Sequence, residues 1–126
     1  MSEQSEALKA RVLAFAVAVL GVIDEFPQRP GPEIVARQIA KSATSIGANY
    51  RAACTARSRR EFVAKLGIAV EEADETEYWL DVIRFAQFAH KPTLAPLRTE
   101  AAELRAILAK SLGTARANLN RLSMTR

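Results

Sequence analysis

Thr44-Ser45-Ile46-Gly47-Ala48-Asn49-Tyr50-Arg51 lies within a long stretch without proline, which extends from Pro32 to Pro92. Around this octapeptide, apolar and small residues recur at steps of three and four, the spacing of one face of an α-helix. The residues of this seam are Val35, Ile39, Ser42, Ile46, Asn49 and Ala53. The pattern predicts a helix that starts at Pro32, since proline is favoured in the first turn of a helix.

Three more segments show helical spacing. The first carries a seam at Leu8, Val12, Phe15, Val19, Val22 and Phe26. Another begins at Ser58, because a serine followed three residues later by Glu61 forms a capping box. Thr93 is the expected N-cap of the last one. The expected helices span about 3–25, 32–56, 59–89 and 94–122.

The connections between these helices are short, and short connections favour antiparallel neighbours. The first connection, 27–32, contains three prolines and stops the preceding helix sharply. At 126 residues, the chain is long enough for one domain with its own core. The sequence therefore predicts an all-α fold, an antiparallel up-down-up-down four-helix bundle, as a single domain over 1–126.

Two features bear on location. Cys54 is the only cysteine, which excludes an intramolecular disulfide and fits a reducing compartment. The apolar run 12–23 is shorter than the roughly 20 residues of a membrane-spanning helix. Glu3 and Glu6 precede it, where a signal peptide would carry basic residues. We expect a cytoplasmic protein without membrane contact.

No pattern of catalytic residues is visible. Six carboxylates lie between Glu71 and Asp81, but a di-iron bundle also needs Glu-x-x-His pairs, and the only histidine is His90, in a predicted loop. No nucleophile is paired with a base and an orienting group. We therefore expect no enzymatic activity, no metal and no cofactor.

Charge is distributed unevenly, although the net charge is only +4. A basic stretch is followed by the acidic stretch 71–81, and Arg116 belongs to a second basic part near the C-terminus. One interpretation is solvated faces with salt bridges between helices or subunits. The other is a surface for nucleic acid. The arginines that would contact the phosphates are Arg51, Arg57, Arg59, Arg60 and Arg116.

Ser42 and Asn49 are polar residues at expected core positions. The simplest explanation is that they bond to each other or to a facing side chain and fix the helix register. The alternative places Asn49 beside Arg51 in a binding groove. Tyr50 and Trp79 would stack on bases in that case, although aromatic residues of this kind more often pack in a core or an interface.

The first helix is apolar on more than one side, because Leu13, Val17 and Leu20 lie off its seam. A helix of this kind needs two partners. One partner is its own bundle, and the other is expected to be a neighbouring subunit. Tyr78 and Trp79 are further candidates for this interface.

The motifs at 45–51, at Ser58-x-x-Glu61-Phe62 and at Glu75-x-x-Tyr78-Trp79-Leu80 together carry a family resemblance. The chain resembles the bacterial four-helix-bundle family first found in intervening sequences of large-subunit ribosomal RNA genes. The resemblance covers nearly the whole chain. Two positions depart from the family pattern: Ala52 replaces a usual glutamate, and Ala43 replaces a frequent glycine.

The resemblance implies a homopentameric ring of up-down bundles. It also implies a distant relation to the accessory variability protein of diversity-generating retroelements, which binds nucleic acid and a partner reverse transcriptase. We therefore expect a homo-oligomer that binds the backbone of RNA or DNA, with a protein such as a reverse transcriptase as a further partner. The alternative is a protein-interaction adaptor or scaffold with no role in nucleic-acid binding.

Overall fold

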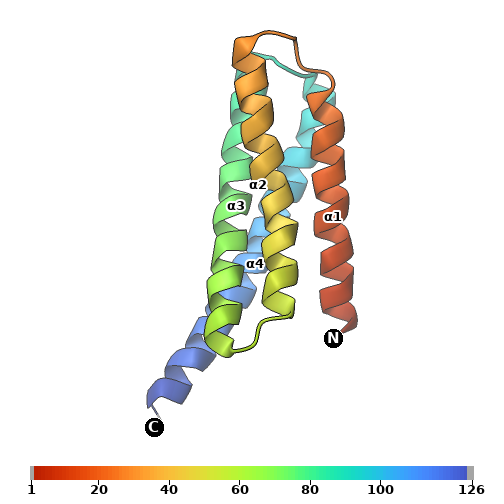
Figure 1. Ribbon diagram of the computed structural model, residues 1–126. Coiled ribbons are helices and arrows are strands. Elements are labelled where there is room, and N and C mark those ends of the chain that lie inside the picture. The colour runs from red at the N-terminus through yellow and green to blue at the C-terminus, as the bar shows by residue number, and fades with distance from the viewer. Residues whose placement is uncertain (1, 125–126) are drawn as a thin grey trace.

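The computed structural model describes residues 2–124, and this part of the chain forms four helices (Figure 1). They are α1 (Glu3–Ile23), α2 (Pro30–Cys54), α3 (Arg59–Ala86) and α4 (Lys91–Met124). Residues 2–124 contain no β-strand, which confirms the all-α prediction. The predicted domain also includes residues 1 and 125–126, which lie outside the described range.

Each helix packs against two others in a cyclic order. α2 contacts α1 and α3, and α4 contacts α3 and α1. In the described part of the chain, no Cα atom of α1 comes within 8 Å of one in α3, so these two helices occupy diagonal positions. The connections 24–29 and 87–90 share one end of the bundle, whereas 55–58 and the start of α1 lie at the other (Figure 1).

The core is built from the buried faces of all four helices. Burial of each large aliphatic side chain contributes about 1.5–3 kcal/mol, so this common core holds the four helices together. Its largest fully buried apolar side chains come from all four helices: Val12, Val19, Ile39, Ile46, Leu66, Leu80, Ile83, Leu104 and Leu108.

The first helix ends two residues earlier than predicted. The amide of Glu25 donates to the carbonyl of Val22, and the amide of Phe26 donates to that of Ile23. These bonds span three residues instead of four, which tightens the chain ahead of Pro27. The residue before a proline also disfavours helical geometry, so the helix stops at this point.

The caps of α2 and α3 differ. Arg29 holds the N-cap position of α2 without a side-chain bond, and Pro30 starts the helix two residues earlier than predicted. At α3, Ser58 Oγ accepts a hydrogen bond from the amide of Glu61 at 3.0 Å, as the capping box predicts. The Glu61 carboxylate reaches back to the amide of Arg57 instead of that of Ser58. Both bonds fix the connection that carries Arg57.

The third helix ends at Ala86, three residues before the predicted end. Gln87 adopts the left-handed conformation, with φ 61° and ψ 42°. Its amide donates to the carbonyl of Arg84, and the amide of Phe88 donates to that of Ile83. This pair of bonds is a Schellman motif, which normally has glycine at the left-handed position. Because position 87 is a glutamine and not a glycine, no signal in the sequence marked this helix end.

The fourth helix begins at Lys91, so Thr93 lies in its first turn and is not the N-cap. The carbonyl of His90 accepts hydrogen bonds from the amides of Thr93 and Leu94. Pro96 lies inside the helix, where it removes one backbone bond. The last buried residue of α4 is Leu112, and the C-terminal end of the helix extends past the end of the bundle (Figure 1).

None of the helices in the range 2–124 combines the length and the apolar content that are needed to cross a bilayer.

Candidate nucleic-acid interface

Arg57, Arg59 and Arg60 lie together at the connection between α2 and α3. Arg57 belongs to the connection, and Arg59 and Arg60 are the first two residues of α3. All three side chains are exposed. Because the Ser58 cap and the Glu61 bond to Arg57 fix the backbone here, these arginines project from an ordered turn. The positive end of the α3 dipole lies at the same place.

Two open depressions separate this turn from the last part of α4. Arg57 and Arg59 line the first one together with Ala115 and Asn118 of α4. Arg59 and Arg60 line the second one with Leu119 and Leu122. The projecting end of α4 therefore forms one wall of the basic surface. We call the set Arg57, Arg59 and Arg60 the basic turn.

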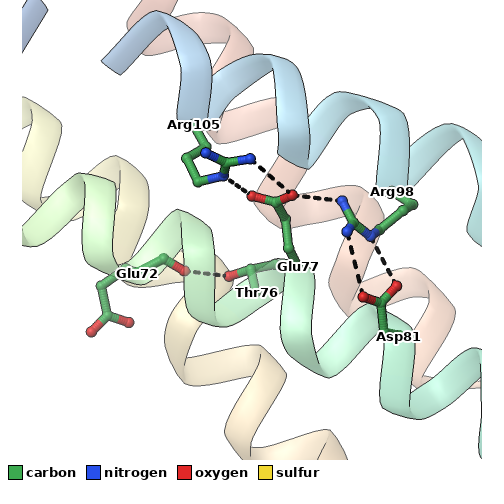
Figure 2. Close-up of polar contacts among 6 residues, drawn as sticks. All are labelled: Glu72, Thr76, Glu77, Asp81, Arg98 and Arg105. Carbon is green, nitrogen blue, oxygen red and sulfur yellow. Dashed lines mark hydrogen bonds and ion pairs between the residues drawn. The ribbon is translucent and has the colours of Figure 1, made fainter. Parts of the chain in front are cut away.

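The carboxylates of α3 neutralise other arginines. Glu77 is only 6% exposed, and it accepts hydrogen bonds from Arg98 at 2.6 Å and from Arg105, both of α4 (Figure 2). Asp81 accepts a further bond from Arg98 at 2.9 Å. The bonds to Asp81 and then Glu77 raise the pKa of Arg98, and the bond to Glu77 raises that of Arg105. These arginines hold α4 against α3.

Arg11 makes the equivalent link between α1 and α4. It donates to Glu100 at 2.6 Å and 2.7 Å, and to Glu103 at 2.5 Å. The hydrogen bond from Arg11 is the main reason that the pKa of Glu100 lies below its usual range. The salt-bridge interpretation of the charge pattern thus applies to these residues inside one chain.

The basic turn differs from these networks, because no ion pair in residues 2–124 involves Arg57, Arg59 or Arg60. The same holds for Arg51 and Arg116 in that range. The only acidic side chain of the turn is Glu61, which is engaged with the Arg57 amide. The turn thus keeps a net positive charge, since it has three arginines and the single carboxylate of Glu61.

The structure separates two of the five predicted arginines from the basic turn. Arg51 lines a groove between α1 and α2, together with Leu13 and Val17. Arg116 lies on α4 beside α3, where its guanidinium is 3.8 Å from the place that a Cβ atom on Gly67 would occupy. Of the five predicted arginines, three therefore form the basic turn. Arg116 lies on the neighbouring helix α4, and Arg51 belongs to the groove between α1 and α2.

Ser42 and Asn49 have different surroundings. Ser42 is fully buried, and its Oγ lies 2.9 Å from Oγ1 of Thr76 on α3. Thr76 Oγ1 also lies 2.8 Å from the carbonyl of Glu72 (Figure 2), and its single proton can serve one of these acceptors at a time. Asn49 is half-buried and donates to the carbonyl of Ser45 in its own helix, so it does not bond to Ser42. Tyr50 occupies the core position instead.

The predicted interface residues lie on two separate surfaces. Leu13, Val17 and Leu20 are exposed in the groove between α1 and α2. Tyr78 is exposed on α3. Trp79 is half-buried, packs edge-on against Tyr78, and donates from Nε1 to Glu75 at 3.1 Å.

Sequence reasoning missed the network around Glu77, although the signal was present. Glu77 and Asp81 are four residues apart, and Arg98 and Arg105 are seven apart. Each spacing places both members on one face of a helix.

No group of three or more potential metal ligands is found in residues 2–124.

Comparison with known proteins agrees with this architecture. The chain is similar to a crystal structure of a Bacteroides thetaiotaomicron protein of unknown function from the S23 ribosomal protein family. The TM-score is 0.79 at 31% sequence identity, and the match covers 86% of this chain and 97% of that one. No curated protein matches the chain.

The family model described as 23S rRNA-intervening sequence protein matches residues 7–110. The match ends close to Leu112, the last buried residue, so the projecting end of α4 lies beyond it. The resemblance found in the sequence motifs is thereby confirmed. The chain belongs to the family of 23S rRNA-intervening sequence proteins.

Proposed function

We propose that the protein is a non-enzymatic, homo-oligomeric bundle that binds the phosphate backbone of RNA or DNA through the basic turn. One observation carries this proposal: Arg57, Arg59 and Arg60 are exposed side by side without a carboxylate partner in the described chain. Arg98 and Arg105, by contrast, are already neutralised by α3. The division leaves three neighbouring arginines without an ion pair in residues 2–124, at the connection between α2 and α3.

The chemistry of the turn favours phosphate over a base edge. Guanidinium groups pair with phosphate oxygens through two parallel N–H bonds, and the start of α3 adds the positive end of a helix dipole. The carboxylate beside the turn, that of Glu61, is engaged with the Arg57 amide. We expect weak base selectivity, because phosphate contacts position a ligand without reading its sequence.

The family description refers to a 23S rRNA intervening sequence, which makes RNA the first ligand to test. We propose an antiparallel up-down-up-down bundle assembled as a pentameric ring, as the family resemblance implies. Repetition of the basic turn around a ring would strengthen binding through avidity without improving a single contact. A cytoplasmic location fits the single cysteine, Cys54.

A salt series tests the function. Nuclease-treated protein is titrated into fluorescently labelled single-stranded RNA and duplex DNA, and binding is followed by anisotropy. Each neutralised phosphate steepens the slope of log K against log salt by about 0.7 to 0.9, so three arginines predict a slope of about −2 or steeper. Absence of binding at low salt overturns the proposal and makes the adaptor function the working one.

A further inference from the structure

An open apolar groove of about 540 Å³ runs between α1 and α2. Leu13, Val17 and Leu20 line it and are 65%, 61% and 44% exposed. The α2 side contributes Gly47, where an added Cβ atom would lie only 3.4 Å from Val12 of α1. The two helices therefore approach each other closely at Gly47. Three large aliphatic side chains that share one exposed groove are typical of an interaction surface.

Basic residues border this groove on the α2 side. Arg37, Lys41 and Arg51 are exposed, and their spacing places them on the same face of α2 as the groove residues Thr44 and Ala48. Arg51 lines the groove itself. On the α1 side, Glu6 and Lys9 line the groove as an ion pair at 3.3 Å, so the basic residues of α2 remain in excess. A partner of this groove would therefore combine an apolar centre with negative charge.

The outer face of α3 has these properties. Glu71, Tyr78 and Phe85 are spaced by seven residues, so they share one face of the helix. Tyr78 and Phe85 are 60% and 78% exposed. Asp74 and Glu75 are exposed beside this line and add two more negative charges. The Arg84 guanidinium lies over the Phe85 ring at one end of this face, 5.4 Å from the ring centroid. Around Tyr78, the α3 face thus offers an aromatic side chain next to carboxylates.

The groove and the α3 face are separate surfaces of one chain, because the groove lies between α1 and α2 and α3 is diagonal to α1. One chain cannot bring them together. Pairing of the groove with another groove would oppose Arg37, Lys41 and Arg51 to each other, and pairing of two α3 faces would oppose their carboxylates. Pairing of the groove with the α3 face of another chain matches aromatic with aliphatic residues and opposite charges.

We infer that the α1–α2 groove binds the α3 face of a second copy of this chain, in a head-to-tail interface. The inference rests on the proposed self-association and is independent of nucleic-acid binding. A heterologous interface of this kind repeats around the assembly and either closes into a ring or continues as a filament. It assigns Arg51 to the subunit contact instead of the phosphate surface.

Paired cysteines test this arrangement. In a Cys54→Ser background, Val17→Cys and Tyr78→Cys are made separately, refolded alone or as an equimolar mixture, and treated with a short thiol cross-linker. Head-to-tail contact gives a cross-linked dimer only in the mixture, and a ladder of higher species when one chain carries both cysteines. A cross-link of Val17→Cys with itself, or none in the mixture, overturns the inference.

A substitution in the groove gives an independent result. Val17→Glu places a carboxylate opposite the acidic α3 face, so we expect monomers by light scattering with an unchanged helical circular dichroism spectrum. Met124→Glu is the matched control, since Met124 is 85% exposed and belongs to neither of the two surfaces. An unchanged oligomer with Val17→Glu contradicts the inference. All samples are free of nucleic acid, so failure of the proposed function leaves these outcomes readable.

Discussion

Arg98 Nη1 donates a hydrogen bond to Glu77 Oε1 across 2.6 Å, which joins α4 to a carboxylate buried in the α3 face (Figure 2). Arg105 bonds to the same carboxylate from two turns further along α4. The pair of arginines fixes the register of the two helices, because a shift of α4 along α3 would leave Glu77 buried without its partners. This network also removes two arginines from the set that can reach a ligand.

Replacement of the Glu77 carboxylate by an amide is expected to destabilise the bundle. Glu77→Gln keeps the shape but loses the charge that both arginines face. We expect a loss of about 1–2 kcal/mol in the free energy of unfolding, since hydrogen bonds to charged groups contribute about 1.5–3 kcal/mol. The loss is below that of a fully buried pair because both arginine side chains reach solvent.

Urea unfolding followed by circular dichroism measures this change. Glu25→Gln is the control, because Glu25 is exposed, lies outside the helices and makes no ion pair in the described range. Such a surface change is expected to stay within about 0.5 kcal/mol. Equal unfolding midpoints for Glu77→Gln and Glu25→Gln would show that the network does not hold α4 in place.

Gln87→Gly is expected to stabilise the end of α3. The left-handed conformation of Gln87 costs a residue with a side chain about 1–2 kcal/mol, whereas glycine adopts it freely. Part of the gain is offset by the greater freedom of glycine in the unfolded chain, so we expect a net gain of about 0.5–1 kcal/mol. Thermal unfolding compares Gln87→Gly with Gln87→Ala, which should stay near the wild type. A lower Tm for the glycine variant would refute this account of the helix end.

The Glu100–Arg11 link predicts a pH dependence. Arg11 lowers the pKa of Glu100 in the folded state, so the contribution of Glu100 is present above its unfolded pKa of about 4.3 and disappears as the pH falls through the folded pKa. For a partly exposed pair worth about 0.5–1 kcal/mol, Glu100→Gln should lower the Tm at pH 7 by about 2–4 °C.

The difference in Tm between the wild type and Glu100→Gln should shrink as the pH falls below about 4. Scanning calorimetry at several pH values measures it, with Glu25→Gln again as the control. A difference that stays constant from pH 7 to pH 3 would mean that ionisation of Glu100 is not the cause.

The number of helices and most of their core residues followed from the sequence, since apolar spacing reports the buried face directly. The seam of α2 was wrong at one step, because it placed Asn49 in the core where the structure has Tyr50. From Ile46, a step of three leads to Asn49 and a step of four leads to Tyr50. Both steps are compatible with helical spacing, so the spacing alone could not show which residue is buried. Ser42 was placed correctly, but its contact with Thr76 depends on the facing helix.

Helix ends were less predictable than helix centres. The end of α3 depends on Gln87 in a conformation that its residue type disfavours, and α4 tolerates Pro96 near its start. Of the candidate site, the sequence identified Arg57, Arg59 and Arg60 together because they are neighbours in the chain. The sequence could not show that Arg51, six residues before Arg57, lies in the groove beside α1. That separation depends on how the helices are rotated against each other.

The central claim is that the basic turn binds a nucleic-acid backbone, and a pair of charge-matched variants tests it most directly. Arg57→Ala with Arg60→Ala removes two charges from the turn. Arg29→Ala with Arg84→Ala removes two exposed charges from the other end of the bundle. The measurement is the anisotropy of labelled single-stranded RNA, titrated with each protein at several salt concentrations. We predict that the first variant binds more weakly and loses about 1.4 to 1.8 from the salt slope, while the second matches the wild type. Equal losses in both variants, or no binding by the wild type at low salt, would contradict the claim.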